Sequence, residues 1–172
     1  LASFAVDRRV AKVCADVLSV VPNRKVVDTV SALLRFEGGL AGTFTAFQAA
    51  AGSENDIKLR IYGENGMIEW NHREASYLRV SMLNQGTKLV GRGDADLPPG
   101  IVALGRIPRG HPEGLREAFA NIYAEAAQER MHRSLGEPVP ALLYPRIEDG
   151  AHTMAFIEAC VASNGRWVDV GA

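Results

Sequence analysis

Residues 26–48 read VVDTVSALLRFEGGLAGTFTAFQ, and this stretch decides the fold. Apolar residues alternate over 30–36, which puts every second side chain on one face of an extended chain. Glu37-Gly38-Gly39 then predicts a hairpin, because glycine tolerates the positive φ that tight hairpin turns require. The alternation resumes over residues 40–48. The stretch therefore predicts two antiparallel strands that bury one face.

The same signals continue on both sides of this hairpin. Residues 57–62 alternate, and Gly63-Glu64-Asn65-Gly66 predicts a second hairpin into residues 67–70. A phosphate-binding loop is the alternative there, but the segment lacks the Lys-Ser/Thr ending of such loops. Further strands are predicted over residues 10–21, 77–82 and 87–91, with a short edge strand or tail at 167–170.

Helical periodicity appears at the two ends of the chain. Residues 1–6 predict a short helix, and a longer one is predicted to begin at Pro112, a residue suited to the first helical position. Its apolar stripe over residues 115–126 is expected to be buried. A last helix is predicted over residues 146–163, and its expected inward face is formed by Ile147, Ala151, Met154, Ile157 and Val161.

Strands in runs followed by helices predict an α+β fold. We expect a largely antiparallel open sheet of about six strands with helices packed on one face. At 172 residues the chain has the length of one ordinary domain.

The composition excludes several functions. Nineteen basic residues against 20 acidic ones give a net charge of -1, so the charge balance predicts neither nucleic-acid nor anionic-membrane binding. Cys14 and Cys160 show no metal or redox spacing. We expect buried free thiols in a reducing cytoplasm, and a disulfide between them is the alternative.

Residues 92–110 form a long segment rich in glycine and proline, and loops of this length are usually functional or disordered. Within it, Arg92-Gly93-Asp94 matches a cell-adhesion tripeptide, which we interpret as chance.

His111 is the first candidate for contact with a substrate, because histidine can donate or accept a hydrogen bond near neutral pH. Its alternative role is to cap the helix predicted at Pro112. Arg109 could bind a hydroxyl pair or a carboxylate, and its alternative is a solvated loop arginine. Gln48 and Asn55 could each bind one hydroxyl, and for both the alternative is a turn or edge hydrogen bond.

Glu148 and His152 stand four residues apart, with Asp149 beside Glu148. We interpret them as a pair on the helix surface rather than metal ligands. No metal site, catalytic residue or nucleophile is assigned.

Segments spread over most of the chain resemble the C-terminal domain of the glucose-fructose oxidoreductase/inositol dehydrogenase/MocA (Gfo/Idh/MocA) family. They are Asp28 to Phe36 with Gly38-Gly39, Gly42 to Gln48, Ile61-Tyr62-Gly63 with Gly66, Gly110-His111-Pro112-Glu113-Gly114, Ala118 to Asn121, Pro145, Glu148-Asp149-Gly150, and Gly165 to Val170. The resemblance implies that this domain has a dihydrodipicolinate-reductase-like fold.

The resemblance implies a parent that is an NAD- or NADP-dependent dehydrogenase acting on a sugar or cyclitol. In that family an N-terminal Rossmann domain binds the dinucleotide, while the C-terminal sheet closes the substrate cavity and often forms the oligomer contact. The chain itself has no G-x-G-x-x-G and no Glu-Lys-Pro. The family's Asp-x-x-x-His would fall just before Leu1. We therefore expect residues 1–172 to be a fragment that is inactive alone, with no cofactor-binding residue.

A different class of function remains open, namely a stand-alone binding or dimerisation module that uses the open face of the sheet. An upstream Rossmann fingerprint in the parent reading frame would decide between the two.

Overall fold

The structure is a computed structural model that describes residues 1–171. The chain divides into two compact units. The first, here called the sheet A unit, combines residues 1–54 with the C-terminal segment from Pro145, and the second, the sheet B unit, is Asn55–Tyr144. Both contain antiparallel sheets and helices, so the α+β fold class is confirmed.

The sheet A unit contains a four-stranded sheet in the order β3-β2-β1-β8. Its elements are α1 (Ala2–Val6), β1 (Val10–Leu18), β2 (Thr29–Phe36), β3 (Ala41–Phe47), α4 (Ile147–Ser163) and β8 (Val168–Asp169). The predicted hairpin joins β2 to β3 through a short 3₁₀ turn, η1 (Glu37–Gly39). Gly38 and Gly39 both have positive φ, 76° and 86°, which accounts for glycine at these positions.

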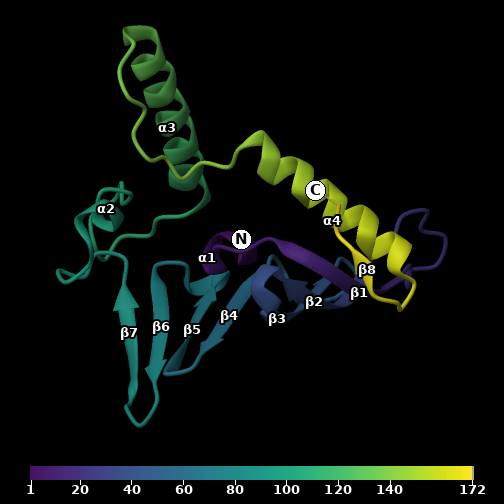
Figure 1. Cartoon of the computed structure of the whole chain (residues 1–172). Helices are drawn as coiled ribbons and strands as arrows, with labels where there is room; N and C mark the ends of the chain where they lie inside the picture. Colours follow the sequence, from purple (N-terminus) through teal and green to yellow (C-terminus); the bar gives the residue numbers. More distant parts are fainter. Residues whose placement is uncertain (172) are drawn as a thin grey trace. The chain divides into compact units, whose positions relative to one another are not determined.

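Helix α4 lies over sheet A (Figure 1) and buries its core. The buried strand residues are Val10, Val13, Ala15, Ala32, Leu34 and Phe36, joined by Ala159 and Cys160 of α4. Phe156 of α4 also meets Phe44 of β3 edge to face, with 5.6 Å between ring centroids. The alternation predicted for residues 30–36 is thereby confirmed.

The predicted inward face of α4 is wrong. Ile147, Met154 and Val161 are exposed by 83%, 57% and 60%. The buried stripe instead runs through Ala159, Cys160 and Ser163, whose small side chains let the helix approach the small residues of β1 and β2 closely. The predicted and the observed stripe both have helical spacing. The prediction chose the stripe with the larger apolar residues, and the structure buries the other.

A buried carboxylate holds the connection between β1 and β2. Asp28 accepts hydrogen bonds from the backbone N–H groups of Val20 and Val21, at 3.0 and 3.1 Å, and forms an ion pair with Arg24. These contacts, the bond from Val20 above all, lower the pKa of the Asp28 carboxyl.

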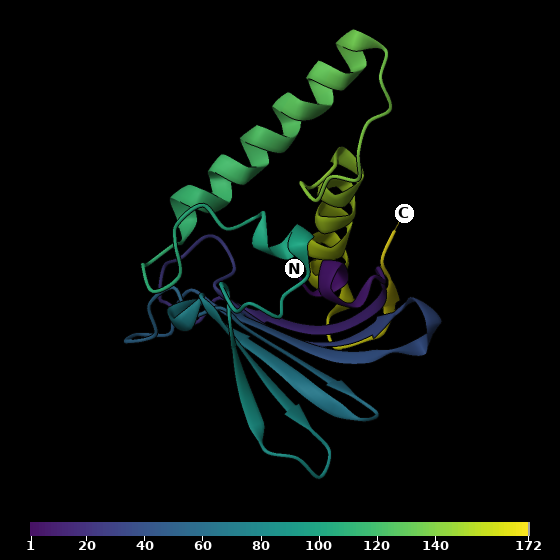
Figure 2. The ribbon, with the colours of Figure 1, turned by 90° about the vertical axis from the view of Figure 1, so that its left-hand side faces the viewer.

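The sheet B unit contains a four-stranded meander in the order β4-β5-β6-β7, drawn in teal in Figure 2. Its elements are β4 (Lys58–Gly63), β5 (Gly66–Asn71), the 3₁₀ turn η2 (His72–Glu74), β6 (Tyr77–Met82), β7 (Thr87–Gly91), α2 (Pro99–Val102) and α3 (Leu115–Leu135). Gly63 pairs with Gly66, so this segment is a hairpin turn, as predicted, rather than a phosphate loop.

The strands thus form two four-stranded sheets where the sequence predicted one sheet of about six. All pairings are antiparallel, as expected. The boundary between the two sheets falls between β3 and β4. Residues 48–57 connect these strands as a loop that contains Gly52, with φ of 82°, and form no strand. The expectation of one domain over residues 1–172 stays a prediction.

Helix α3 differs from its prediction in two respects. It begins at Leu115 with Gly114 as its N-cap, three residues after Pro112. Its apolar stripe is exposed, with Leu115 at 69%, Phe119 at 51% and Tyr123 at 71%. The expected burial of this stripe is therefore wrong for the structure as described.

Candidate functional site

The long segment between β7 and α3 carries the two adjacent candidates, and it is ordered by internal hydrogen bonds. It contains the short helix α2, which the sequence did not predict. The Nδ2 of Asn121 on α3 donates to the carbonyl of Leu104 at 2.9 Å, while the Oδ1 of Asn121 accepts from Nε of Arg106 at 2.6 Å. This loop is therefore attached to the first turns of α3.

His111 has an exposed side chain in this loop. Its backbone is held at both ends, because its N–H donates to the carbonyl of Pro108 at 3.2 Å and its own carbonyl accepts from Arg92 at 3.1 Å. The alternative role of His111 as a helix cap is wrong. The cap is Gly114, whose N–H donates to the Glu117 carboxylate at 2.9 Å and lowers the pKa of that carboxyl. The imidazole of His111 thus stands free of the helix end.

Arg109 is two residues away from His111 and is not simply solvated. Its guanidinium forms an ion pair with Asp94 at 3.0 Å, although the Arg109 side chain remains 69% exposed. Asp94 also accepts the N–H of Gly91 at the end of β7, at 2.8 Å. The structure therefore brings Arg109 and His111 together in one loop that is fastened to the end of β7.

Gln48 and Asn55 lie outside this loop in the sequence and have hydrogen-bond partners of their own. Gln48 follows β3 in the sheet A unit, where its backbone N–H donates to the carbonyl of Asp28 at 2.8 Å and its side chain is exposed. Asn55 belongs to the sheet B unit, and its Nδ2 lies 3.4 Å from Nε2 of His72. Arg109 and His111 are therefore the two candidates that one loop carries, and the roles of all four residues toward a substrate stay predictions.

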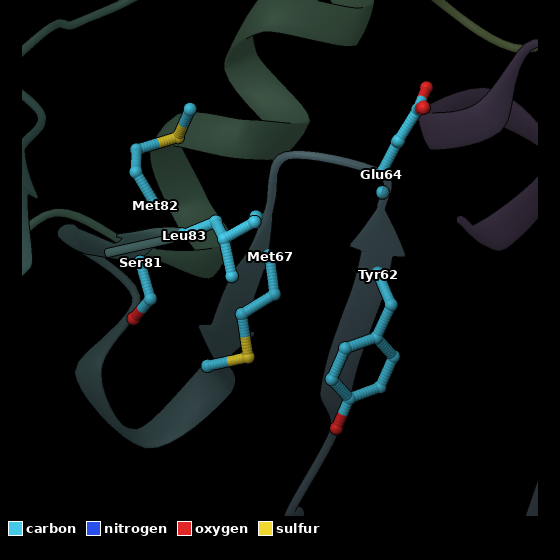
Figure 3. Close-up of a pocket in the computed structure, with 8 residues that line it drawn as sticks. Tyr62, Glu64, Met67, Ser81, Met82 and Leu83 are labelled. Carbon is cyan, nitrogen blue, oxygen red and sulfur yellow. The ribbon is translucent and has the colours of Figure 1, made fainter. Parts of the chain in front are cut away.

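Two depressions on sheet B were not predicted from the sequence. The larger has a volume of about 300 Å³ and is lined mainly by apolar side chains, with Met67, Met82 and Leu83 on one side and Tyr62 on the neighbouring strand (Figure 3). The smaller, about 60 Å³, lies among Glu69, Asn71, Glu74, Tyr77, Arg79 and Leu89. None of the four candidate residues lines either depression. The polar side chains at the larger one are those of Tyr62, Glu64 and Ser81.

His152 of α4 is half-buried rather than a surface residue. Both of its ring nitrogens are buried and lack a hydrogen-bond partner among residues 1–171. No ion pair with Glu148 is formed in the described part of the chain. In that part, no three His, Cys, Asp or Glu side chains come together in a way that could hold a metal ion.

The two cysteines are free thiols. Cys14 lies between Val13 and Ala15 on β1 and so points to the opposite face of sheet A from Cys160, which α4 buries against that sheet. Burial raises the pKa of the Cys160 thiol. Among the helices of residues 1–171, none is long and apolar enough to cross a membrane.

Fold and sequence together define an antiparallel α+β domain, and known proteins resemble it in both. Residues 1–69 match the family model described as the GFO/IDH/MocA C-terminal domain. The uncharacterized oxidoreductase YfiI of Bacillus subtilis (strain 168) is 31% identical over 147 residues, which cover 83% of this chain and 37% of that protein.

Solved structures agree. An oxidoreductase from Sinorhizobium meliloti superimposes with a TM-score of 0.89 at 34% identity, over 96% of this chain and 48% of that chain. An inositol dehydrogenase homolog from Azotobacter vinelandii, complexed with NADH and myo-inositol, gives a TM-score of 0.88 at 30% identity, over 95% of this chain and 45% of that chain. The resemblance of this chain to the Gfo/Idh/MocA C-terminal domain family, predicted from its sequence, is confirmed.

This chain spans less than half the length of each of these three relatives. The nicotinamide cofactors named above belong to the relatives. The sequence of this chain has no glycine-rich dinucleotide turn, and within residues 1–171 its sheets are antiparallel, whereas such turns join the parallel strands of a Rossmann fold.

Proposed function

We propose that this chain is the substrate-side domain of an NAD(P)-dependent dehydrogenase that oxidises a hydroxyl group of a sugar or cyclitol. The observation that carries the proposal is the likeness to the inositol dehydrogenase homolog complexed with NADH and myo-inositol, which extends over 95% of this chain at 30% identity. A levoglucosan dehydrogenase complexed with NADH and levoglucosan, 25% identical, supports the same substrate class.

In this reaction a hydride leaves the carbon and a proton leaves the hydroxyl as the carbonyl forms. A nicotinamide ring accepts the hydride, and we place it in a Rossmann domain of the whole protein rather than in this chain. The share of this chain is to bind and orient the polyol. His111 can donate to or accept from a hydroxyl, and Arg109 can donate to one while Asp94 holds it. Gln48 and Asn55 stay further candidates, each able to bind a hydroxyl through its amide.

The test is to express the protein encoded by the whole reading frame and to measure reduction of NAD and of NADP with a panel of polyols. We expect activity with at least one sugar or cyclitol. A full-length protein that binds neither dinucleotide and oxidises no polyol would contradict the proposal. The 172-residue chain alone should bind no dinucleotide in a calorimetric titration.

We further propose that sheet B forms a contact between copies of the protein. One of its faces is almost wholly apolar, and the residues that share it include Leu59, Ile61, Ile68, Trp70, Leu78, Val80 and Val90. These side chains are half-buried or, for Ile68, 36% exposed. The same face would serve a stand-alone dimerisation module, so it does not by itself favour either function.

Light scattering coupled to gel filtration would test this contact. We expect an oligomer that Ile68→Lys dissociates and that Lys58→Gln, on the opposite face of β4, leaves intact. A wild-type monomer at micromolar concentration would refute it. We also propose a cytoplasmic location, supported by the two free thiols.

A further inference from the structure

The tripeptide Arg92-Gly93-Asp94, whose match to a cell-adhesion motif we interpreted as chance, makes contacts that have no role in the proposed function as stated above. It follows β7 directly, and the N–H of Arg92 donates to the carbonyl of Ser76, the residue before β6, at 2.8 Å. Each of its three residues then contacts the loop that carries His111. The tripeptide is therefore placed to link the end of sheet B to that loop.

The strongest contact is an ion pair between Arg92 and Glu113, whose side chains are 22% and 8% exposed. Glu113 is otherwise satisfied by the loop itself, because its two carboxylate oxygens accept the N–H groups of Arg106 and Ile107, each at 3.0 Å. A buried carboxylate with three partners fixes the backbone that supplies them. Glu113 thus connects the backbone of residues 106 and 107 to the end of the same loop.

Arg92 extends the same network to the candidate histidine. One terminal nitrogen of its guanidinium donates to the carbonyl of Ile107 at 2.8 Å, and the other donates to the carbonyl of His111 at 3.1 Å. The planar fork of arginine can serve a carboxylate and two carbonyls at once, which a lysine ammonium on a flexible stem cannot do with the same geometry. The backbone of His111 is therefore held by the residue that also neutralises Glu113.

Gly93 and Asp94 complete the link on the side of Arg109. A Cβ at residue 93 would lie 2.7 Å from the Cβ of Arg109, so only glycine allows the two segments to approach this closely. Asp94 then forms its ion pair with Arg109 at 3.0 Å. Both candidates of the loop, Arg109 and His111, are consequently anchored to the same tripeptide.

We propose that Arg92 is a positioning residue which, through its clamp on Glu113 and the carbonyl of His111, presents the His111 imidazole to the polyol. The proposal rests on the proposed function, since it assumes that His111 contacts the substrate. Arg92 itself contacts no substrate in this scheme. It acts through the backbone that it holds.

The first test is amide hydrogen exchange on the 172-residue chain with Arg92→Lys, which keeps the charge beside Glu113 and loses the fork. The amides of Arg106 and Ile107 donate to Glu113, and that of His111 donates to Pro108. We expect exchange of these three amides to rise about tenfold, because their opening then no longer requires the Arg92 contacts to break. The amides of β4 to β6 should stay protected, which shows that the variant is folded. Arg130→Lys, an exposed position on α3, is the matched control. Unchanged exchange of the amides of Arg106, Ile107 and His111 would overturn the clamp.

The second test is a double-mutant cycle in the full-length enzyme with the polyol that it oxidises. We expect Arg92→Lys to lower kcat/KM by about 10- to 100-fold when His111 is present, and by less than about twofold in a His111→Ala background. Equal losses in both backgrounds, or full activity of His111→Ala, would refute positioning through His111. An enzyme that oxidises no polyol would refute the proposed function instead, while the exchange experiment would still decide on the clamp.

Discussion

Ser163 joins α4 to β1, and replacing it with alanine should measurably weaken the sheet A unit. The hydroxyl accepts the N–H of Ala15 at 2.8 Å and donates to the carbonyl of Arg166 at 2.5 Å. Ser163 and Ala15 are each 1% exposed, so water cannot replace the lost acceptor. A buried N–H left without a partner costs about 1–3 kcal/mol. The better helix propensity of alanine offsets about 0.5 kcal/mol of this cost, which leaves a net loss of about 0.5–2.5 kcal/mol.

Urea unfolding followed by fluorescence measures this loss. A Trp70→Phe background removes the tryptophan of the sheet B unit, so that Trp167 reports on the sheet A unit alone. Ser31→Ala, exposed on β2 of the same sheet, is the matched control and should change the free energy of unfolding by no more than about 0.5 kcal/mol. Equal effects of Ser163→Ala and Ser31→Ala would refute the reasoning that this hydroxyl satisfies a buried amide.

Three further substitutions or treatments test other parts of the structure. Because the folded-state pKa of Asp28 is lowered, its stabilising contribution is complete above the ordinary value of 3.8 and is lost as pH falls through the folded-state pKa. The urea midpoint of Asp28→Asn should therefore lie below that of the wild type at pH 7, and the gap should narrow toward about pH 3. In sheet B, a Cβ at Gly66 would lie 2.4 Å from a backbone oxygen of the next strand, whereas one at Gly86 meets nothing within 4 Å. Gly66→Ala should lower the free energy of unfolding by about 1–3 kcal/mol and Gly86→Ala by clearly less. Mass spectrometry after brief alkylation of the native chain should find Cys14 modified ahead of Cys160, whose buried thiol has a raised pKa, and equal labelling would contradict the described burial.

The strands were predictable because their signals are local. Alternation over residues 30–36 and the glycines at 38 and 39 act within one hairpin, and the structure confirms both. The number of sheets was not predictable, since it depends on whether the free edge of β3 pairs with β4, and local patterns do not determine that pairing. The face of α4 was missed for a related reason. Helical spacing allowed two stripes, and only the small residues across the interface select the one that contains Ala159 and Ser163.

The candidate site shows the same division between local and distant information. The sequence placed His111 and Arg109 side by side, and they lie in one loop. It did not reveal that Arg92 and Asp94 hold that loop, because contacts 15 to 19 residues apart leave no period or motif of their own. The sequence signal that could have indicated an internal anchor is an acidic residue between a proline and a glycine, as Glu113 is.

The sheet A unit takes strands from both ends of the chain, with β8 paired to β1 and the whole sheet B unit inserted between β3 and α4. This order has a consequence for synthesis. All residues of the sheet B unit leave the ribosome before α4 does, whereas β1, β2 and β3 must wait for α4 to cover them. During that interval the apolar face that contains Val13 and Leu34 has no cover from α4. We therefore expect chains that stop before α4 to bind chaperones or aggregate, even though the inserted unit is complete.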